Sequence, residues 1–127
     1  MTQGTPNGNL TIQAVPFPAD TNGGGDIFGG WVLSHMDVAA GVAAAERAKG
    51  RVSTVAIEAM RFHAPVLVGD LFTVYTEIKR TGTTSITIHV EAWVRRHTDS
   101  KPRMVTEGDF TFVAIESSGV KRKLPPE

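Results

Sequence analysis

One segment, residues 20–50, limits what this chain can fold into. Its residues 31–45 have helical character and are apolar on nearly every side, and a helix of that kind belongs in a protein interior. Only Ser34, His35 and Asp37 interrupt the apolar run. Asp37 needs an explanation, because a buried carboxylate is costly unless it has a partner or a function.

Glycines, which carry no side chain, precede this helix and begin it. Glycines occupy positions 23–25, and the pair Gly29 and Gly30 falls at the expected helix start. The first N–H groups of a helix have no partner within it, and the helix dipole favours negative charge there. Such a start can bind an anion, or an oxygen that becomes negative during a reaction. Asp37 follows Gly30 by about two helical turns and so lies on roughly the same face. The plainer explanation is that the glycines only permit close packing.

The composition excludes several classes of protein. The 127 residues suffice for a single domain, 1–127, and we expect flexible ends at 1–8 and 118–127. Thirteen basic and thirteen acidic side chains balance, so no global field attracts nucleic acid or an anionic membrane. Cysteine is absent, which removes disulfides and thiol nucleophiles. Neither a signal peptide nor a convincing membrane span is visible, so we expect a cytoplasmic protein.

The period of the hydrophobic pattern becomes strand-like after the helix. Alternation is clearest in 85–96, where the even-numbered residues from Ile86 to Val94 point one way and Thr87, His89 and Glu91 point the other. The full set of expected strands is 10–15, 51–66, 71–80, 85–96 and 104–116. Short connections join antiparallel neighbours, and long twisted strands can wrap one helix. A domain of this size has no second layer for the helix's other faces, which predicts a homodimer or larger symmetric assembly.

Three segments carry a resemblance to a known family: PADTNGGGDIFGGWVLSHMD, GRVSTVAIEAMRFHAPVLVGD and GTTSITIHVEAWV. Together they resemble the hotdog-fold acyl-CoA thioesterases of the YciA type, over residues 10–125. The resemblance implies an α+β fold in which a five- to six-stranded antiparallel sheet wraps a long central helix. It also implies dimers that pair two sheets edge to edge, often assemble into hexamers, and hydrolyse acyl-CoA thioesters with little selectivity for the acyl chain. No cofactor is implied beyond the coenzyme A of the substrate.

The resemblance also assigns roles to individual residues. It makes Asp37 the catalytic carboxylate, Asn22 a conserved amide, and the backbone at Gly29 and Gly30 the oxyanion hole. It places the site between subunits, so Asn22 and Asp37 of one site are expected from different chains. Asp37 then acts as a general base on water or as a nucleophile that forms a mixed anhydride, and the sequence leaves both open. The plainer explanations are a structural pairing of Asp37 across the interface and an ordinary Asn-Gly turn at Asn22.

Coenzyme A has an anionic nucleotide end, so basic side chains and turn N–H groups near a groove are candidates for binding it. The candidates in this sequence are Arg80, Gly82, Thr83, Thr84 and Ser85, with Arg51 as another. Ala59, Met60 and Phe62 are candidates for lining the pantetheine or acyl channel. Solvated surface charge and core packing are the plainer explanations for these two groups. The four histidines show no metal-ligand spacing, so the sequence predicts no metal site.

Two other functions remain as alternatives to a thioesterase. The first is an acyl-CoA-binding sensor of the same fold without catalysis, which would have no need of a carboxylate beside the thioester. The second is a hydratase or dehydratase of this fold. It is disfavoured because no histidine stands near the helix start with an acidic partner in the loop.

Overall fold

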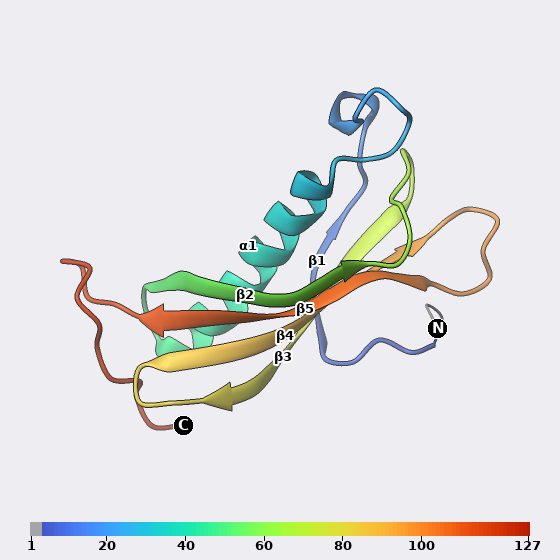
Figure 1. Ribbon diagram of the computed structural model, residues 1–127. Coiled ribbons are helices and arrows are strands. Elements are labelled where there is room, and N and C mark those ends of the chain that lie inside the picture. The colour runs from blue at the N-terminus through green and yellow to red at the C-terminus, as the bar shows by residue number, and fades with distance from the viewer. Residues whose placement is uncertain (1–3) are drawn as a thin grey trace.

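The computed structural model describes residues 4–127, and within them a single α-helix lies across one face of a five-stranded antiparallel sheet (Figure 1). The helix is α1 (Gly29–Ala48), and a short 3-10 helix, η1 (Pro18–Asp20), precedes it. The strands are β1 (Asn9–Ala14), β2 (Val52–Phe62), β3 (Leu71–Thr81), β4 (Ser85–Arg95) and β5 (Arg103–Ala114). The α+β class predicted from the sequence is confirmed, with five strands.

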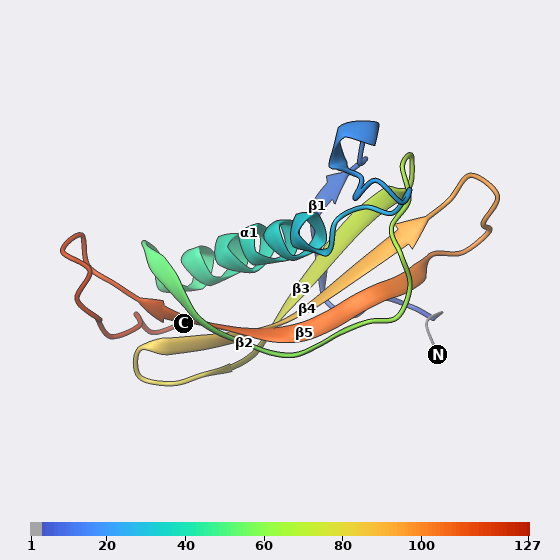
Figure 2. The same cartoon turned by 45° about the horizontal axis from the view of Figure 1, so that its top comes forward.

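The strand order is β1-β3-β4-β5-β2, so the two strands that flank α1 in the sequence are the two edges of the sheet. The short connections from β3 to β4 and from β4 to β5 join antiparallel neighbours, as expected for brief loops. The chain therefore crosses from one edge to the other by way of α1. The twisted sheet curves around the helix, which Figure 2 shows from a second direction.

The core lies between α1 and the inner face of the sheet. The even-numbered side chains of β4 are buried there as predicted, and they pack with Phe110 and Phe112 of β5 and Phe72 of β3. The helix contributes small residues to this contact, and a Cβ placed on Gly41 would meet the ring of Phe112 at 3.7 Å. Small side chains let the helix backbone approach the sheet closely, which fixes the height of α1 above the strands.

One stripe of α1 has no cover in the single chain. It consists of Ser34, Val38, Val42 and Glu46, spaced four residues apart, with Val38 56% and Val42 48% exposed. The sheet covers only one side of α1, so its own chain does not enclose the helix, as expected for a domain with no second layer. Within residues 4–127, no helix has the length and apolar character needed to cross a membrane.

Strand β2 departs from the predicted alternation. It ends at Phe62 and not at Val66, and its pairing with β5 is interrupted twice. At the second interruption Ala59 and Met60 stand opposite Gly108, and Ala59 takes a left-handed φ of 59°. A bulge of this kind shifts the two-residue period by one, so a strict alternation over 51–66 does not persist.

Both chain ends were expected to be flexible, and their described parts make hydrogen bonds to the domain. The N–H of Asn7 donates to Glu91 Oε1 at 3.1 Å, while residues 1–3 lie outside the described part of the chain. At the other end, Arg122 Nη2 donates to the carbonyl of Ala48 at 2.9 Å, and the N–H of Leu124 donates to the carbonyl of Thr83 at 2.9 Å. The C-terminal segment thus joins the end of α1 to the β3–β4 hairpin.

Candidate active site

The start of α1 presents two backbone donors to solvent. Phe28 is the N-cap residue, and its side chain makes no capping hydrogen bond. The carbonyl of Phe28 accepts from the N–H groups of Trp31 and Val32, whereas those of Gly29 and Gly30 have no acceptor within the described residues. Both glycines are exposed, and a Cβ on Gly29 would lie 3.7 Å from the ring of Phe62. The helix start is therefore open to an oxygen ligand, as the sequence indicated.

Asp37 lies two turns further along α1 and is half-buried, not enclosed, in the single chain. Its Oδ1 accepts a hydrogen bond of 2.8 Å from the hydroxyl of Thr54 on β2. No donor reaches its Oδ2 in the part of the chain that the structure describes. A single hydroxyl donor fixes the orientation of a carboxylate and leaves its second oxygen for another partner. Asp37 is thus held in place with one oxygen available.

Thr54 is a site residue that the sequence reasoning missed. It pairs with Phe112 of β5, and its hydroxyl reaches α1 across the inner side of the sheet edge. The available signal was a polar residue between Val52 and Ala56 on one side of β2, the strand that follows the helix carrying Asp37. Only the packing of β2 against α1 shows that the two side chains meet.

Asn22 lies in the exposed loop before α1, where it closes a turn. Its Oδ1 accepts from the N–H of Gly24 at 2.9 Å, and its own N–H donates to the carbonyl of Asp26 at 2.8 Å. The first bond is that of an ordinary Asx turn, and the second closes the loop 22–26 through the backbone. No hydrogen bond joins Asn22 to Asp37 among residues 4–127, so a single chain does not assemble the pair.

The proposed coenzyme A residues fall at the opposite end of α1. Arg80 is exposed at the end of β3, and the turn 82–85 closes with a 2.8 Å bond from the N–H of Gly82 to the carbonyl of Ser85. The C-terminal segment joins this hairpin to the last turn of α1, and a 20-residue helix is about 30 Å long. Arg51 lies near this end too and donates to the carbonyl of Ser117. One chain therefore does not bring these residues to its own helix start.

The three candidates for the acyl channel are also separated. Phe62 lies beside Gly29 at the helix start. Met60 packs closely over Gly108, where the bulge leaves no room for a Cβ. Ala59 instead lines a groove of about 300 Å³ with His89 and Asp109. Of the three, Phe62 is the one adjacent to the candidate site.

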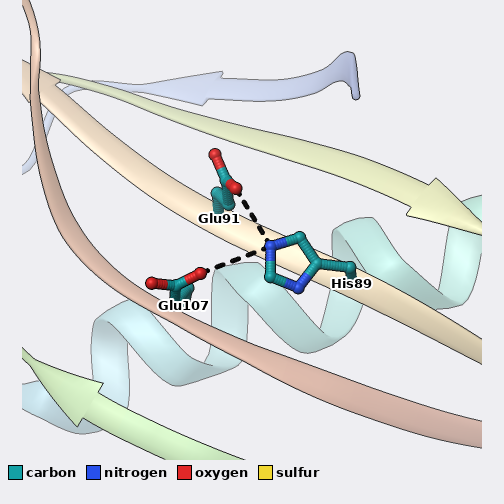
Figure 3. Close-up of side chains that lie close together, drawn as sticks. All are labelled: His89, Glu91 and Glu107. Atoms are coloured by element: carbon teal, nitrogen blue, oxygen red, sulfur yellow. Dashed lines mark hydrogen bonds and ion pairs between the residues drawn. The ribbon is translucent and has the colours of Figure 1, made fainter. Parts of the chain in front are cut away.

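A second polar cluster lies on the face of the sheet away from α1 (Figure 3). His89 Nε2 lies 2.9 Å from Glu91 Oε2 and 3.4 Å from Glu107 Oε1, and its Nδ1 lies 3.0 Å from Asp109 Oδ1. The outward placement of His89 and Glu91 predicted from the sequence is confirmed. Donor atoms of His89, Glu91 and Glu107 fall within 4.8 Å of one another, so this group could hold a divalent cation. The expectation of no metal site stays a prediction.

His89, Glu91, Glu107 and Asp109 form the outer-face cluster, and hydrogen bonds shift the pKa values of three of these residues. Partial burial acts to lower the pKa of His89, but the bonds to Asp109 and Glu91 outweigh it and raise the pKa above its ordinary 6.5. Burial acts to raise the pKa of Glu91, yet the donors from Asn7, Trp93 and His89 hold it below 4.5. Burial also acts to raise the pKa of Asp109, but the hydrogen bonds and positive charges of Lys79 and His89 lower that pKa below 3.8.

The fold and the open helix start define a class of protein, and the comparisons with known families agree with it. Residues 24–100 match the model of the thioesterase superfamily. This chain belongs to the thioesterase superfamily.

Several relatives are similar to this chain along its length. It is 43% identical to the acyl-CoA thioester hydrolase YciA of Escherichia coli (strain K12), over 99% of this chain and 98% of that protein. Identity to YciA of Salmonella typhimurium is 45%, over 95% of this chain and 93% of that protein. The family resemblance deduced from the sequence is confirmed.

Solved structures match the fold equally well. A hexameric thioesterase, y2039 from Yersinia pestis, superposes with a TM-score of 0.92 at 44% identity, over 97% of this chain and 100% of that chain. HI0827, a hexameric broad-specificity acyl-coenzyme A thioesterase, gives a TM-score of 0.91 at 41% identity, over 98% of this chain and 86% of that chain. The hotdog fold predicted for this chain is confirmed.

The outer-face cluster predicts a pH-dependent contribution to stability. The raised pKa of His89 gives stabilisation that is complete below 6.5 and lost as pH rises through its folded pKa. The lowered pKa values of Glu91 and Asp109 give stabilisation present above 4.5 and 3.8, lost as pH falls through their folded values. We therefore expect the loss of Tm in His89→Gln to be greatest at about pH 5.5 and smaller at about pH 9.

Thermal unfolding of wild type and His89→Gln across this pH range measures the effect. His97→Gln is the matched control, because His97 is exposed and forms no ion pair with a carboxylate of residues 4–127. An equal loss of Tm at all pH values in His89→Gln would contradict a pH-dependent contribution of the outer-face cluster to stability.

Proposed function

We propose that this protein is an acyl-CoA thioester hydrolase. The observation that carries the proposal is the position of the Asp37 carboxylate on α1, where a hydrogen bond from Thr54 of β2 holds it. The same helix begins with the unpaired N–H groups of Gly29 and Gly30. Helical side chains lean toward the N-terminus of the helix, so Asp37 reaches back toward those donors. The relatives named as acyl-CoA thioester hydrolases support the same substrate class.

The arrangement suits attack on a thioester carbonyl. The carbonyl oxygen binds at the helix start, where N–H donors stabilise the negative charge that develops on it; one such donor is typically worth about 10²–10³ in rate. As a general base, Asp37 takes a proton from water through Oδ2 while the water oxygen bonds to the carbonyl carbon. The C–S bond then breaks, and the coenzyme A sulfur leaves with the proton held by Asp37.

The nucleophilic route uses the same groups in another order. Asp37 Oδ2 attacks the carbonyl carbon, coenzyme A leaves, and water hydrolyses the resulting mixed anhydride to regenerate the carboxylate and release the free acid. Thr54 supports either route, because its hydroxyl donates to Asp37 Oδ1 and fixes the orientation of the carboxylate. Asp37 Oδ2 then stays available for the water or the carbonyl carbon. Both routes remain part of the proposal.

The proposed active unit is a symmetric oligomer, a homodimer that assembles into a hexamer. Support comes from the uncovered Val38 and Val42 on α1, from the edge position of β2, and from the hexameric state of the similar solved structures. In this arrangement Asn22 of one subunit serves the Asp37 of another. The Arg80 hairpin likewise serves coenzyme A bound at the helix start of a neighbouring subunit, because the hairpin lies too far from the helix start of its own chain.

A cytoplasmic location stays a prediction from the sequence.

Replacement of Asp37 by asparagine tests the reaction. Asp37→Asn keeps an oxygen that can accept from Thr54 but removes the base, so we expect kcat to fall about 10²–10⁴-fold while coenzyme A affinity is retained. Thiol release from several acyl-CoA thioesters measures turnover, and calorimetry measures coenzyme A binding. Undiminished turnover in this variant would falsify the assigned role of Asp37, and binding without turnover in wild type would favour the sensor.

Thr54→Val tests the positioning of the carboxylate. The change removes one hydroxyl and keeps the shape, and a hydrogen bond to a charged group is worth about 1.5–3 kcal/mol, so kcat should fall roughly tenfold to a hundredfold. Thr87→Val is the control, since the Thr87 hydroxyl pairs with Thr111 on the other face of the sheet. Equal kcat values in the two variants would speak against a role for Thr54.

Substitution of the helix stripe tests the shared site. Val42→Asp places a charge on the uncovered face of α1, so we expect dissociation of the oligomer and loss of turnover together. Sedimentation velocity and acyl-CoA hydrolysis are the two measurements. Val120→Asp is the control, because Val120 is also exposed but lies in the C-terminal turn. A wild-type protein that sediments as a stable monomer and still turns over would contradict the proposed assembly.

A further inference from the structure

A buried ion pair fixes the turn between β2 and β3. Asp70 is only 2% exposed, and its Oδ1 accepts from Arg96 Nε at 3.1 Å. Its Oδ2 accepts from the N–H of Leu67 at 2.9 Å. Arg96 also donates through Nη2 to the carbonyl of Pro65 at 3.0 Å. One carboxylate and one guanidinium therefore hold both halves of the turn 65–70.

This turn supports the segment that leads into α1. The N–H of Ile27 donates to the carbonyl of Val66 at 2.9 Å, and Asp26 forms a β-bridge with Leu67. Ile27 and Val66 are both buried, so this contact is part of the core. In Figure 1 the connection between β2 and β3 runs up beside the loop that precedes the helix.

The position of the helix-start donors depends on this support. Gly29 follows Ile27 by two residues, and the N-cap residue Phe28 has no side-chain capping bond of its own. The direction of the Gly29 and Gly30 N–H groups is thus set by the backbone that the turn 65–70 anchors. Asn22 is tied to the same segment, because its N–H donates to the carbonyl of Asp26.

We propose that Asp70 and Arg96 are positioning residues for the thioester hydrolysis, and this inference rests on the proposed function. They contact neither Asp37 nor the helix-start glycines. They hold the turn 65–70 against which the helix start and the Asn22 loop are aligned. A buried ion pair contributes little net stability compared with apolar packing, whereas its directional bonds define a geometry. Displacements of about 1 Å at a reacting group can cost up to about 10²-fold in rate.

Two substitutions of this ion pair provide the test. Asp70→Asn keeps an acceptor for the N–H of Leu67 but removes the charge that Arg96 needs. Arg96→Lys keeps the charge, but one ammonium group cannot reproduce the guanidinium's simultaneous bonds to Asp70 and Pro65. We expect kcat to fall about tenfold or more in each variant, with KM changed by less than about threefold.

Arg122→Gln is the matched control. Arg122 is also a half-buried arginine that donates to two backbone carbonyls, those of Ala48 and Ile115, but at the far end of α1. We expect this variant to lose Tm as the Arg96 variant does while its kcat stays at the wild-type value. A loss of kcat confined to the Asp70 and Arg96 variants is what a positioning role requires and a purely structural role does not.

The outcomes separate this inference from the proposed function. Wild-type hydrolysis together with unchanged kcat in Asp70→Asn and Arg96→Lys would overturn the positioning role and leave the thioesterase assignment intact. If Asp70→Asn does not fold, the kcat of Arg96→Lys relative to Arg122→Gln decides. Failure of the wild-type protein to hydrolyse any acyl-CoA thioester would overturn the proposed function and this inference with it.

Discussion

The contact between one small-residue face of α1 and one face of the sheet is the constraint on which the rest of the structure depends. Glycine and alanine on this face let the helix approach Phe112 and its neighbours closely, and the apolar side chains of β4 fill the space between. Burial of this apolar area is the main stabilising term for so small a domain. The same contact sets the direction of α1, and with it the position of everything that α1 carries.

The candidate active site lies at the border of that contact. Asp37 is half-buried because it stands between the covered face of α1 and the uncovered stripe that contains Val38 and Val42. A carboxylate there is close enough to the sheet to be held by Thr54 and close enough to the uncovered face to meet a ligand or another chain. Incomplete cover of the helix and the location of the proposed chemistry thus have one structural origin.

Local patterns in the sequence predicted much of this arrangement. The spacing between Gly30 and Asp37 and the alternation of β4 depend only on helical and strand periods, so they were readable without tertiary contacts. The family resemblance of the glycine turn and its neighbouring motifs added the family and the fold, which the comparisons confirm, and a substrate class that matches the names of the relatives. The roles of Asn22, Gly29 and Gly30 stay predictions, because no hydrogen bond among the described residues of a single chain joins them to Asp37.

By itself, then, the sequence determined the helix that carries Asp37 and the main strands, because these follow from periods of two and 3.6 residues. It also determined the free donors at the helix start, because the first N–H groups of any helix lack partners within it. Tertiary structure alone decided which distant side chains meet. Thr54 reaches Asp37 only through the packing of β2 on α1, and His89 faces Asp109 only through the register of β4 with β5. The bulge at Ala59 and the ion pair of Asp70 with Arg96 likewise have no local signal, since each depends on strand pairing between segments far apart in the chain.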